Sequence, residues 1–324
     1  MSFDPLDAAD SIYAQVAELW LTADPLLPKP VTLAPGCGAE FIATGADGHP
    51  TALASCEHWQ GEPESLDLCW GAARRFELTT RIAGPDVAGA LDGLLLQWAA
   101  HLARTPAAYD EDSAALVTWP SRDVTAATTL LRHGFTPMAV VAARGAKPAP
   151  TASGDRPPAP PGVTVKRATP ADVDEVVRLA AETVRYDSYF GGVMERPWTA
   201  AALRREFAGF LAAPEPWIWL AERDGANIGM LAAEPPDLAE WIAPMAGRTP
   251  VAYLLLLGVS PGERGGGVGA ALTTRFHRQI ESAGIAVTLL HYAQTNPLSA
   301  PFWGRQGYRP LWTSWESRPA RAIR

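Results

Sequence analysis

The chain lacks several features that would place it in a familiar class of protein. No apolar run approaches the roughly twenty residues needed to span a bilayer, and residues 1–7 lack the basic start and apolar stretch of a secretory signal. The three cysteines are odd in number and unlike zinc ligands in spacing, so we expect reduced thiols, no metal and a cytoplasmic location. A net charge of −8 argues against a general nucleic-acid binder, which needs a basic face.

The composition is that of a globular protein with room for two domains. At 324 residues, with 48% hydrophobic and 19% charged residues, the chain can form two ordinary cores. A stretch dominated by proline, glycine and small residues, 146–162, divides it. We therefore expect one domain over residues 1–145, a linker over 146–162 and a second domain over 163–324.

A glycine-rich loop in the second part is the most informative segment. The apolar run Val251–Val259 predicts a strand, Pro261 predicts a turn, and residues 270–281 predict a helix. The residues between the turn and the helix read Arg-Gly-Gly-Gly-Val-Gly, positions 264–269. Glycines allow the backbone to approach a ligand closely, and free N–H groups at a helix start attract an anion. The segment therefore predicts a phosphate-binding loop.

The neighbours of the glycines exclude the two best-known loops of this kind. A nucleotide P-loop needs Lys and Ser or Thr after its last glycine, and here Ala270 and Ala271 follow. A dinucleotide-binding fold places its glycines in the first strand–helix turn, with an acidic residue about twenty positions later. This loop lies late in the chain, and the corresponding downstream residues are Thr288 to His291.

The loop instead resembles that of a third family. The pattern Val-x-Pro-x-x-Arg-Gly-x-Gly-x-Gly, from Val259 to Gly269, is similar to the coenzyme A loop of GCN5-related N-acetyltransferases (GNAT). A second signature of that family, Asn-x-x-Ala-x-x-Phe-Tyr-x-x-x-Gly-Phe, resembles residues 296–308. Asn296, Phe302 and Gly307 match it, Ser299 and Tyr308 are close variants, and Trp303 departs from it. The resemblance extends from Val163 to the C-terminus.

Markers of the same family recur in the first part. An Asp-Gly hairpin turn is expected at Asp224–Gly225 and again at Asp47–Gly48. The run from Asp123 to Gly134 repeats the spacing from Asn296 to Gly307, at nearly the same offset along the chain. We therefore expect an α/β fold of two tandem GNAT-like domains, each a mixed, mainly antiparallel sheet flanked by helices.

The first copy lacks the chemistry of the loop. Between a strand expected at 75–82 and a helix expected at 87–103 stands Gly84-Pro85-Asp86. Pro85 removes an N–H donor and Asp86 would repel a phosphate. We interpret the first domain as a degenerate copy without the coenzyme A pyrophosphate loop, with a structural or substrate-shaping role.

The resemblance implies an acetyl-CoA site in the second copy. The fourth and fifth strands would separate, and the pantetheine chain would add between them like a strand, pairing with backbone groups near Leu257 and Val259. The pyrophosphate would lie on N–H groups at the helix start, with the charge of Arg264 nearby. The residues expected to hold acetyl-CoA are Leu257, Val259, Arg264, Gly265, Gly266, Gly267, Val268, Gly269, Ala270, Asn296, Ser299, Phe302 and Trp303.

Few residues could act as acid or base. Trp303 stands where many relatives have a tyrosine, and its indole N–H is too weak an acid to protonate a thiolate. His291, on the strand before Asn296, has an ordinary pKa suited to proton transfer at neutral pH. A structural histidine bonded to a neighbouring loop is the alternative. Tyr253 and Glu240 are secondary candidates, and His277, on the predicted helix, is expected to be exposed.

The acceptor is expected to contact segments of the chain that vary among members of the family. The resemblance places Tyr186, Asp187, Tyr189 and Phe190 where relatives line the acceptor pocket, and a second stretch, from Glu234 to Trp241, follows the third strand. Aromatic and acidic residues together suit an amine with an apolar portion. A loop that caps the sheet with solvated carboxylates is the alternative.

We therefore predict acetyl transfer from acetyl-CoA to the amine of a small molecule, by direct attack in a ternary complex. A non-catalytic acetyl-CoA sensor is one alternative, since Trp303 replaces tyrosine. An aminoacyl-tRNA-dependent transferase is another, which the acidic charge disfavours. No nucleic acid or membrane partner is expected, and the protein would be a monomer or homodimer.

Overall fold

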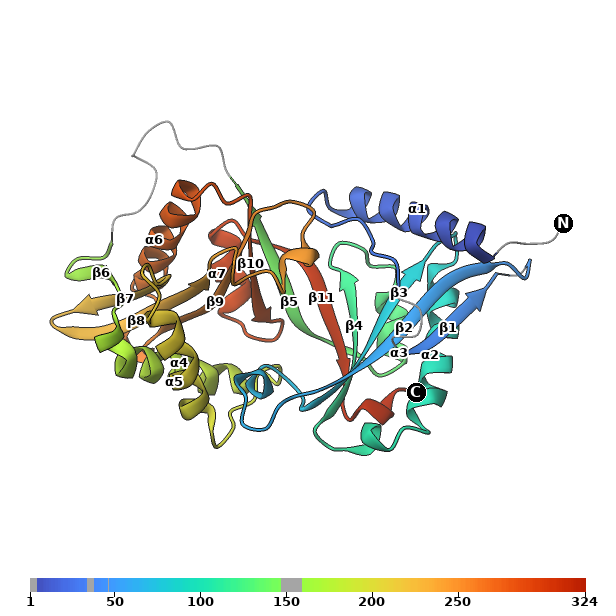
Figure 1. The fold of residues 1–324 in the computed structure, drawn as a ribbon, viewed down its shortest axis with the longest axis horizontal. Coiled ribbons are helices and arrows are strands. Elements are labelled where there is room, and N and C mark those ends of the chain that lie inside the picture. The colour runs from blue at the N-terminus through green and yellow to red at the C-terminus, as the bar shows by residue number, and fades with distance from the viewer. Residues whose placement is uncertain (1–4, 34–37, 46, 147–158) are drawn as a thin grey trace. The chain divides into compact units, whose positions relative to one another are not determined.

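The structure, a computed structural model, describes residues 5–33, 38–45, 47–146 and 159–324 (Figure 1). Most of the expected linker, and Cys37, therefore lie outside the described residues. The chain forms two compact units. The front unit comprises Met1–Gly61, Ala72–Val141 and Pro310–Arg324, and the rear unit comprises Glu62–Gly71 and Ala142–Arg309.

The front unit is a mixed sheet with helices. Its elements are α1 (Pro5–Ala23), β1 (Ala39–Thr44), β2 (Pro50–Gln60), β3 (Arg74–Ile82), α2 (Val87–Leu102), β4 (Ser113–Pro120), α3 (Ala127–Arg132), the first part of β5 (Thr136–Gly145), and β11 (Arg309–Ser317). The strand order is β1-β2-β3-β4-β11-β5. β3 and β4 are parallel, whereas β1–β2, β2–β3 and β4–β11 are antiparallel.

The rear unit repeats this plan. Its elements are the end of β5, β6 (Val163–Arg167), α4 (Val173–Ser188), α5 (Thr199–Leu211), β7 (Ile218–Arg223), β8 (Ala226–Glu234), β9 (Val251–Val259), α6 (Val268–Ser282), β10 (Val287–Ala293) and α7 (Ser299–Arg305). The strand order is β5-β10-β9-β8-β7-β6, with β9 and β10 parallel and β6 to β9 antiparallel.

The same succession of elements occurs twice. In the front unit β1-β2-β3-α2-β4-α3 follow one another, and in the rear unit β7-β8-β9-α6-β10-α7 do so. The rear hairpin turns at Asp224 and Gly225, both with positive φ, which is the geometry that an Asp-Gly pair favours. These elements agree with the mixed α/β fold expected from the sequence.

The two units differ from the contiguous halves that the linker suggests. β11 pairs with β4, from Trp312 opposite Pro120 to Ser317 opposite Ala115, so the C-terminal residues complete the front sheet. In the rear unit, Ala146 N donates to Ala286 O at 2.7 Å just after β5. Composition marks where a chain is extended, but strand pairing decides which sheet a segment joins, and that pairing is not local.

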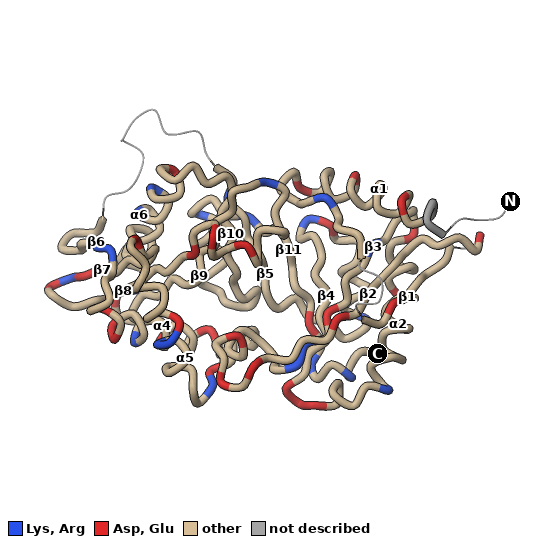
Figure 2. The backbone as a smooth tube through the Cα atoms, in the orientation of Figure 1, with Lys and Arg blue, Asp and Glu red and all other residues tan. Residues whose placement is uncertain are grey.

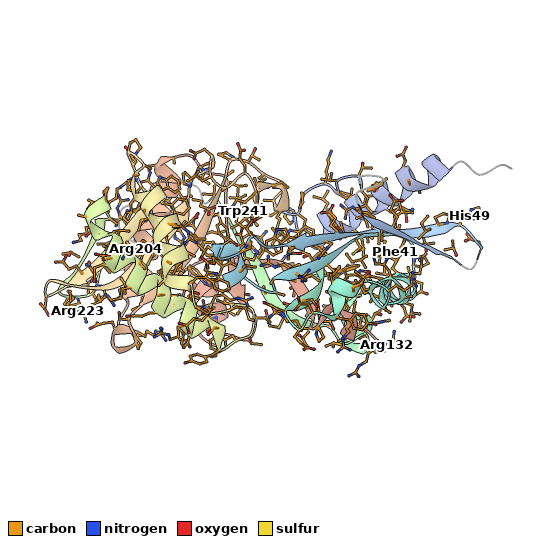
Figure 3. All side chains as sticks on the ribbon, turned by 60° about the horizontal axis from the view of Figure 1, so that its bottom comes forward. Phe41, His49, Arg132, Arg204, Arg223 and Trp241 are labelled. Atoms are coloured by element: carbon orange, nitrogen blue, oxygen red, sulfur yellow. The ribbon has the colours of Figure 1, made fainter. Side chains whose placement is uncertain are left out.

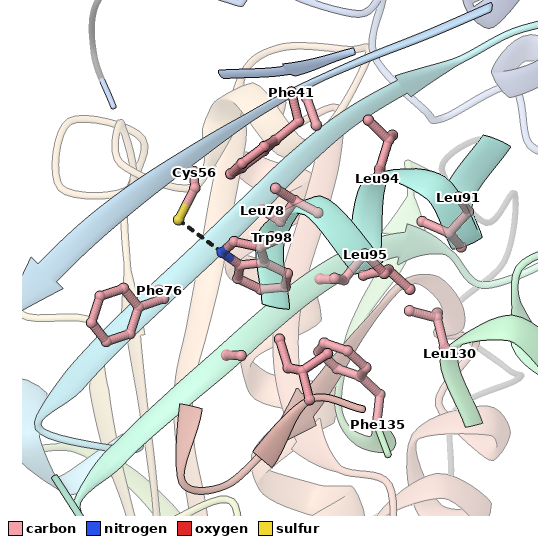
Figure 4. Close-up of a cluster of buried hydrophobic side chains, with 14 of the residues drawn as sticks. Phe41, Cys56, Phe76, Leu78, Leu91, Leu94, Leu95, Trp98, Leu130 and Phe135 are labelled. Atoms are coloured by element: carbon pink, nitrogen blue, oxygen red, sulfur yellow. Dashed lines mark hydrogen bonds between the residues drawn. The ribbon is translucent and has the colours of Figure 1, made fainter. Parts of the chain in front are cut away.

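Each unit has its own apolar core. Figure 4 shows the front core, where Trp98 of α2 lies among leucines and donates to Cys56 Sγ at 3.1 Å. Burial raises the pKa of Cys56 to about 11, so this thiol stays protonated and is a packing group. In the rear unit, α4 and α5 place Val176, Ala180 and Phe207 against β7 and β8.

Two glycines set the distance between helices and sheet in the rear unit. A Cβ at Gly258 of β9 would lie 2.2 Å from Thr183 Oγ1 of α4. A Cβ at Gly229 of β8 would lie 3.1 Å from Val268 Cγ1 of α6. Because Gly229 pairs with Val259, the neighbour of Gly258, these two contacts lie on opposite faces of the sheet. α4 and α6 therefore flank β8 and β9 at close range.

Charged residues of both signs are spread over the two units. Figure 2 shows Lys and Arg interspersed with Asp and Glu along each of them. Within the described ranges, no helix combines the length and the apolarity required to cross a bilayer. Among the same residues, no group of three or more His, Cys, Asp or Glu side chains is arranged to hold a metal ion.

Candidate active site

The glycine loop forms the start of α6. Gly265 has φ +80° and Gly267, the residue before the helix, has φ +85°, conformations that glycine adopts without strain. The first recorded bond of the helix runs from Ala271 N to Gly267 O at 3.0 Å. The N–H groups of Val268 to Ala270 therefore precede the internal bonding of the helix, and Gly267 offers no side chain to cap them.

Two further expected residues lie against this helix start. A Cβ at Gly269 would be 3.4 Å from the ring of Phe302 and 3.7 Å from Leu257 Cδ2. Phe302 lies on α7 and makes an edge contact with Trp303, with 4.8 Å between the ring centroids. The fold thus brings Leu257, Gly269 and Phe302 together from three separate elements.

The front unit differs at the corresponding helix. α2 also follows a positive-φ glycine, Gly84. Its first turn, however, is capped by Asp86, whose carboxylate accepts a hydrogen bond from Gly89 N at 2.9 Å. The first backbone N–H groups of α6 have no side-chain cap, whereas in α2 the Asp86 carboxylate accepts a hydrogen bond from one of the corresponding N–H groups.

β9 and β10 separate beside the loop. Their recorded pairs run from Val251 opposite Val287 to Leu254 opposite Leu290, although β9 continues to Val259. On its other side β9 has an irregularity at Leu255, because Ala232 pairs with Leu256 and Ala233 with Leu254. An extra residue of this kind bends and twists a strand, so β9 turns away where its pairing with β10 ends.

The separated part of β9 presents backbone groups away from β8. Ser260 N donates to Ile228 O at 2.9 Å, and in an antiparallel pair alternate residues bond to the same neighbour. Val259 and Leu257 therefore direct their backbone groups to the side from which β10 has departed. Consistent with this, Val259 O accepts from Arg264 Nε at 3.0 Å.

Arg264 and Asn296 both contact the end of α4. The Arg264 guanidinium lies 4.1 Å from the ring centroid of Tyr186. Asn296 is only 4% exposed, and its Nδ2 donates to Asp187 Oδ1 at 2.9 Å while its Oδ1 accepts from Leu298 N. Residues expected for the cofactor and for the acceptor therefore form one cluster.

A second bond ties this cluster together. Thr295 Oγ1 donates to Phe190 O at 2.9 Å, and Phe190 makes an edge contact with Tyr186. The loop after β10 is thus fixed to the end of α4. Burial raises the pKa of Asp187 to about 6, against the opposing effects of the Asn296 bond and the Arg264 charge.

Asp187→Asn should change the pH dependence of stability. The folded carboxyl holds its proton up to a pKa of about 6 and the unfolded one only up to 3.8, so the wild type loses stability as pH rises between these values. Relative to wild type, the variant should gain up to about 2 kcal/mol between pH 4 and pH 7. Urea unfolding at both pH values measures this, and a constant difference would contradict it.

The expected catalytic residues lie in a second cluster. Tyr253 Oη and His291 Nδ1 are 2.9 Å apart, which joins β9 to β10. The ring of Trp241, labelled in Figure 3, is parallel to that of His291 at 6.3 Å and edge-on to that of Tyr253 at 5.0 Å. Trp241 Nε1 also donates to Glu234 Oε2 at 2.8 Å.

Both members of the Tyr253–His291 pair are neutral at pH 7. Desolvation by surrounding protein lowers the pKa of His291 below its usual 6.5, although the residue as a whole is exposed. Burial and the Glu234 charge raise the pKa of Tyr253. The pair therefore offers one basic ring nitrogen and one hydroxyl proton.

The sequence placed Glu234 in a stretch expected to meet the acceptor but did not single it out as a site residue. Glu234 ends β8 directly opposite Tyr253, and only this cross-strand pairing brings the carboxylate to the cluster. An acidic residue at the end of a buried strand, before Pro235 and Pro236, was the available signal. Tyr189 and Glu240 are exposed, and within the described ranges neither makes a hydrogen bond or ring contact with Tyr253, His291 or Trp241.

The expectation that His277 is exposed was wrong, whereas Trp303 and Ser299 lie in or beside α7. His277 is buried at 5% exposure, because α6 turns that face inward, where a ring nitrogen lies 3.3 Å from Tyr308 Oη. Trp303 is buried and packs edge-on against Phe302 and Tyr308. Ser299 begins α7, with its N–H donating to Asn296 O.

Comparison with known proteins agrees with this geometry. Residues 182–308, which contain the loop, the separated strands and α7, match the Acetyltransferase (GNAT) family. The chain carries a GNAT-family domain. This domain occupies most of the rear unit and includes both clusters of the candidate site, and the family is one that uses acetyl-CoA.

Curated relatives match only part of the chain. It is 29% identical over 157 residues to the mycothiol acetyltransferase of Streptomyces avermitilis, covering 47% of this chain and 44% of that protein. A mycothiol acetyltransferase of a Parafrankia species is 29% identical over 209 residues, covering 59% and 62% respectively. In both matches the chain spans less than two thirds of the length of the relative.

Solved GNAT structures match the whole chain. A GCN5-related N-acetyltransferase from Sphaerobacter thermophilus has a TM-score of 0.57 at 16% identity, covering 98% of this chain and 95% of its own. At that identity the likeness concerns the fold. It confirms the α/β, GNAT-like architecture expected from the sequence for both units.

Proposed function

We propose that the rear unit binds acetyl-CoA and transfers its acetyl group to the amine of a small molecule by direct attack in a ternary complex. One observation carries the proposal: α6 begins with positive-φ glycines and uncapped N–H groups beside the unpaired edge of β9. The corresponding helix of the front unit is closed by Asp86. An uncapped helix start favours a diphosphate, and an open strand edge favours an extended amide chain.

The residues present fit this cofactor. N–H groups from Gly265 to Ala270 would hold the pyrophosphate, and backbone groups of Leu257 and Val259 would pair with the pantetheine amides. A Cβ at Gly267 would lie 3.1 Å from Pro160 Cγ, and one at Gly269 would contact the ring of Phe302. Side chains larger than glycine at these two positions would therefore reduce the space at the start of α6. When bound, acetyl-CoA supplies an acetyl group activated as a thioester.

Side chains of the protein can accept a proton from the acceptor amine and donate one to the leaving thiolate. With Nδ1–H donating to Tyr253, Nε2 of His291 is free to accept a proton from an ammonium acceptor, and the Tyr253 hydroxyl can donate one. This tautomer is an assignment from the hydrogen bond. The N–H of Val259, directed away from β8, is placed to donate to a carbonyl oxygen. Trp303 takes no part in proton transfer, because it is buried in packing contacts.

Calorimetry of the full chain with coenzyme A tests the proposed cofactor binding. Thiol release from acetyl-CoA in the presence of a panel of amines tests the proposed acetyl transfer. The panel includes amines related to mycothiol, because curated relatives carry that name. We expect binding to the rear unit and turnover with at least one amine. Absence of heat with coenzyme A would overturn the proposal.

A non-catalytic acetyl-CoA sensor is the second candidate. The packing of Trp303 at the position where relatives have a tyrosine favours it. Binding of coenzyme A without thiol release across the whole panel would support the sensor.

A further inference from the structure

Glu234 is a buried carboxylate that forms no ion pair within the described part of the chain. It is 8% exposed, and its Oε2 accepts from Trp241 Nε1. Among the described residues, none is recorded as donating to Oε1 and no Lys, Arg or His forms an ion pair with Glu234. Burying a carboxylate without a positive partner costs free energy. Oε1 of Glu234 is therefore suited to accept a hydrogen bond from a ligand.

The carboxylate of Glu206, on α5, adds a second negative charge near Glu234. Burial raises the pKa of Glu234, the hydrogen bond from Trp241 opposes this rise, and the Glu206 carboxylate adds to it. Asp67 acts on Glu206 in the same way. The charges of Glu234 and Glu206 together favour a cation here and disfavour a second anion.

Trp241 supplies an apolar wall at the same place. Its side chain is 57% exposed, yet its N–H is fixed by Glu234 and its ring edge by Tyr253. An exposed indole held in one orientation can cover an apolar group or a cation. The same ring is parallel to His291, so a group bound on it lies beside the Tyr253–His291 pair.

We propose that Glu234 and Trp241 form the acceptor-recognition site, and that the acceptor enters as an alkylammonium ion with an adjoining apolar portion. The ammonium donates to Glu234 Oε1, and the apolar portion packs on Trp241. Amines that carry a carboxylate close to the nitrogen are repelled by Glu234 and Glu206. This inference rests on the proposed function, since it names the class of amine that the same site accepts.

Binding of 2-phenylethylammonium and of its neutral isostere 2-phenylethanol to the full chain tests the inference without turnover. By calorimetry at pH 7, the wild type should bind the ammonium at least about tenfold more tightly than the alcohol, the usual size of one charge-assisted hydrogen bond. Glu234→Gln keeps an oxygen for the Trp241 N–H but removes the charge, so it should weaken ammonium binding by about tenfold or more.

Asp237→Asn is the matched control, because Asp237 is an exposed carboxylate in the same loop. It should leave ammonium binding unchanged. Equal affinity of the wild type for the ammonium and the alcohol, no ammonium binding at millimolar concentration, or wild-type affinity in Glu234→Gln would each overturn the inference. The ammonium–alcohol comparison needs no variant, so it is decisive even if Glu234→Gln folds poorly.

Coenzyme A affinity, measured on the same samples, separates the two proposals. It should be the same in wild type and Glu234→Gln, since Glu234 is not among the cofactor residues. Loss of ammonium selectivity with intact coenzyme A binding would overturn the recognition site alone. Ammonium selectivity in a wild type that binds no coenzyme A would overturn the proposed function alone.

Discussion

Gly267→Asp is expected to reduce coenzyme A binding by about 100-fold or more, because it places a carboxylate where the diphosphate would lie. In the front unit an aspartate already stands immediately before the corresponding helix, α2. There Asp86, the residue before α2, accepts from Gly89 N and so occupies the helix start. Calorimetry of the full-length variant with coenzyme A measures the loss.

Gly267→Asn separates charge from shape. Both variants place a side chain of the same size at φ +85°, a conformation that Asn and Asp tolerate better than most residues, and both approach Pro160. Only aspartate adds a negative charge, so the asparagine variant should keep measurably more affinity. Equal losses in the two variants would show that sterics, and not the charge, governs the site. Undiminished binding in Gly267→Asp would remove the pyrophosphate loop from the proposal.

His291→Gln is expected to lower the turnover number by about 100-fold with little change in coenzyme A affinity, since general acid–base groups contribute effects of this size. Glutamine can still bond to the Tyr253 hydroxyl but cannot act as a base near neutral pH. Steady-state thiol release with the best amine of the panel, together with calorimetry, measures the two quantities separately.

The pH profile adds a test specific to proton transfer. Desolvation lowers the pKa of His291, so the neutral base should persist, and kcat/KM should stay high, to a pH below the usual 6.5. The acid limb of the profile should be absent in His291→Gln. Tyr292→Phe, on the next residue of β10 and directed to the other face, is the control and should retain turnover. Wild-type turnover in His291→Gln would exclude His291 from the mechanism.

The loop and the duplication could be predicted because their signals are local. A glycine before α6 and the Asp-Gly turn of the β7–β8 hairpin are required by backbone conformations that few other residues adopt. The start of α2 is equally local, since Asp86 bonds to a backbone N–H three residues away. Such features depend on neighbours in the chain, and the sequence contains them in full.

The polar clusters depend on contacts between distant segments. Asp187 meets Asn296 only because the loop after β10 reaches the end of α4, and this burial then raises the pKa of Asp187. Glu234 reaches Tyr253 through the pairing of β8 with β9. No spacing along the chain reports either contact.

The sequence by itself determined where a glycine-rich, uncapped helix start occurs, that an acidic residue stands before its counterpart in the front half, and that the elements occur twice. The tertiary structure alone decided that β11 completes the front sheet, that His277 faces inward, and which carboxylates lose their water. The reason is that strand pairing and desolvation are properties of residues brought together in space. Local patterns specify backbone conformation, whereas the charge state of a site depends on everything packed around it.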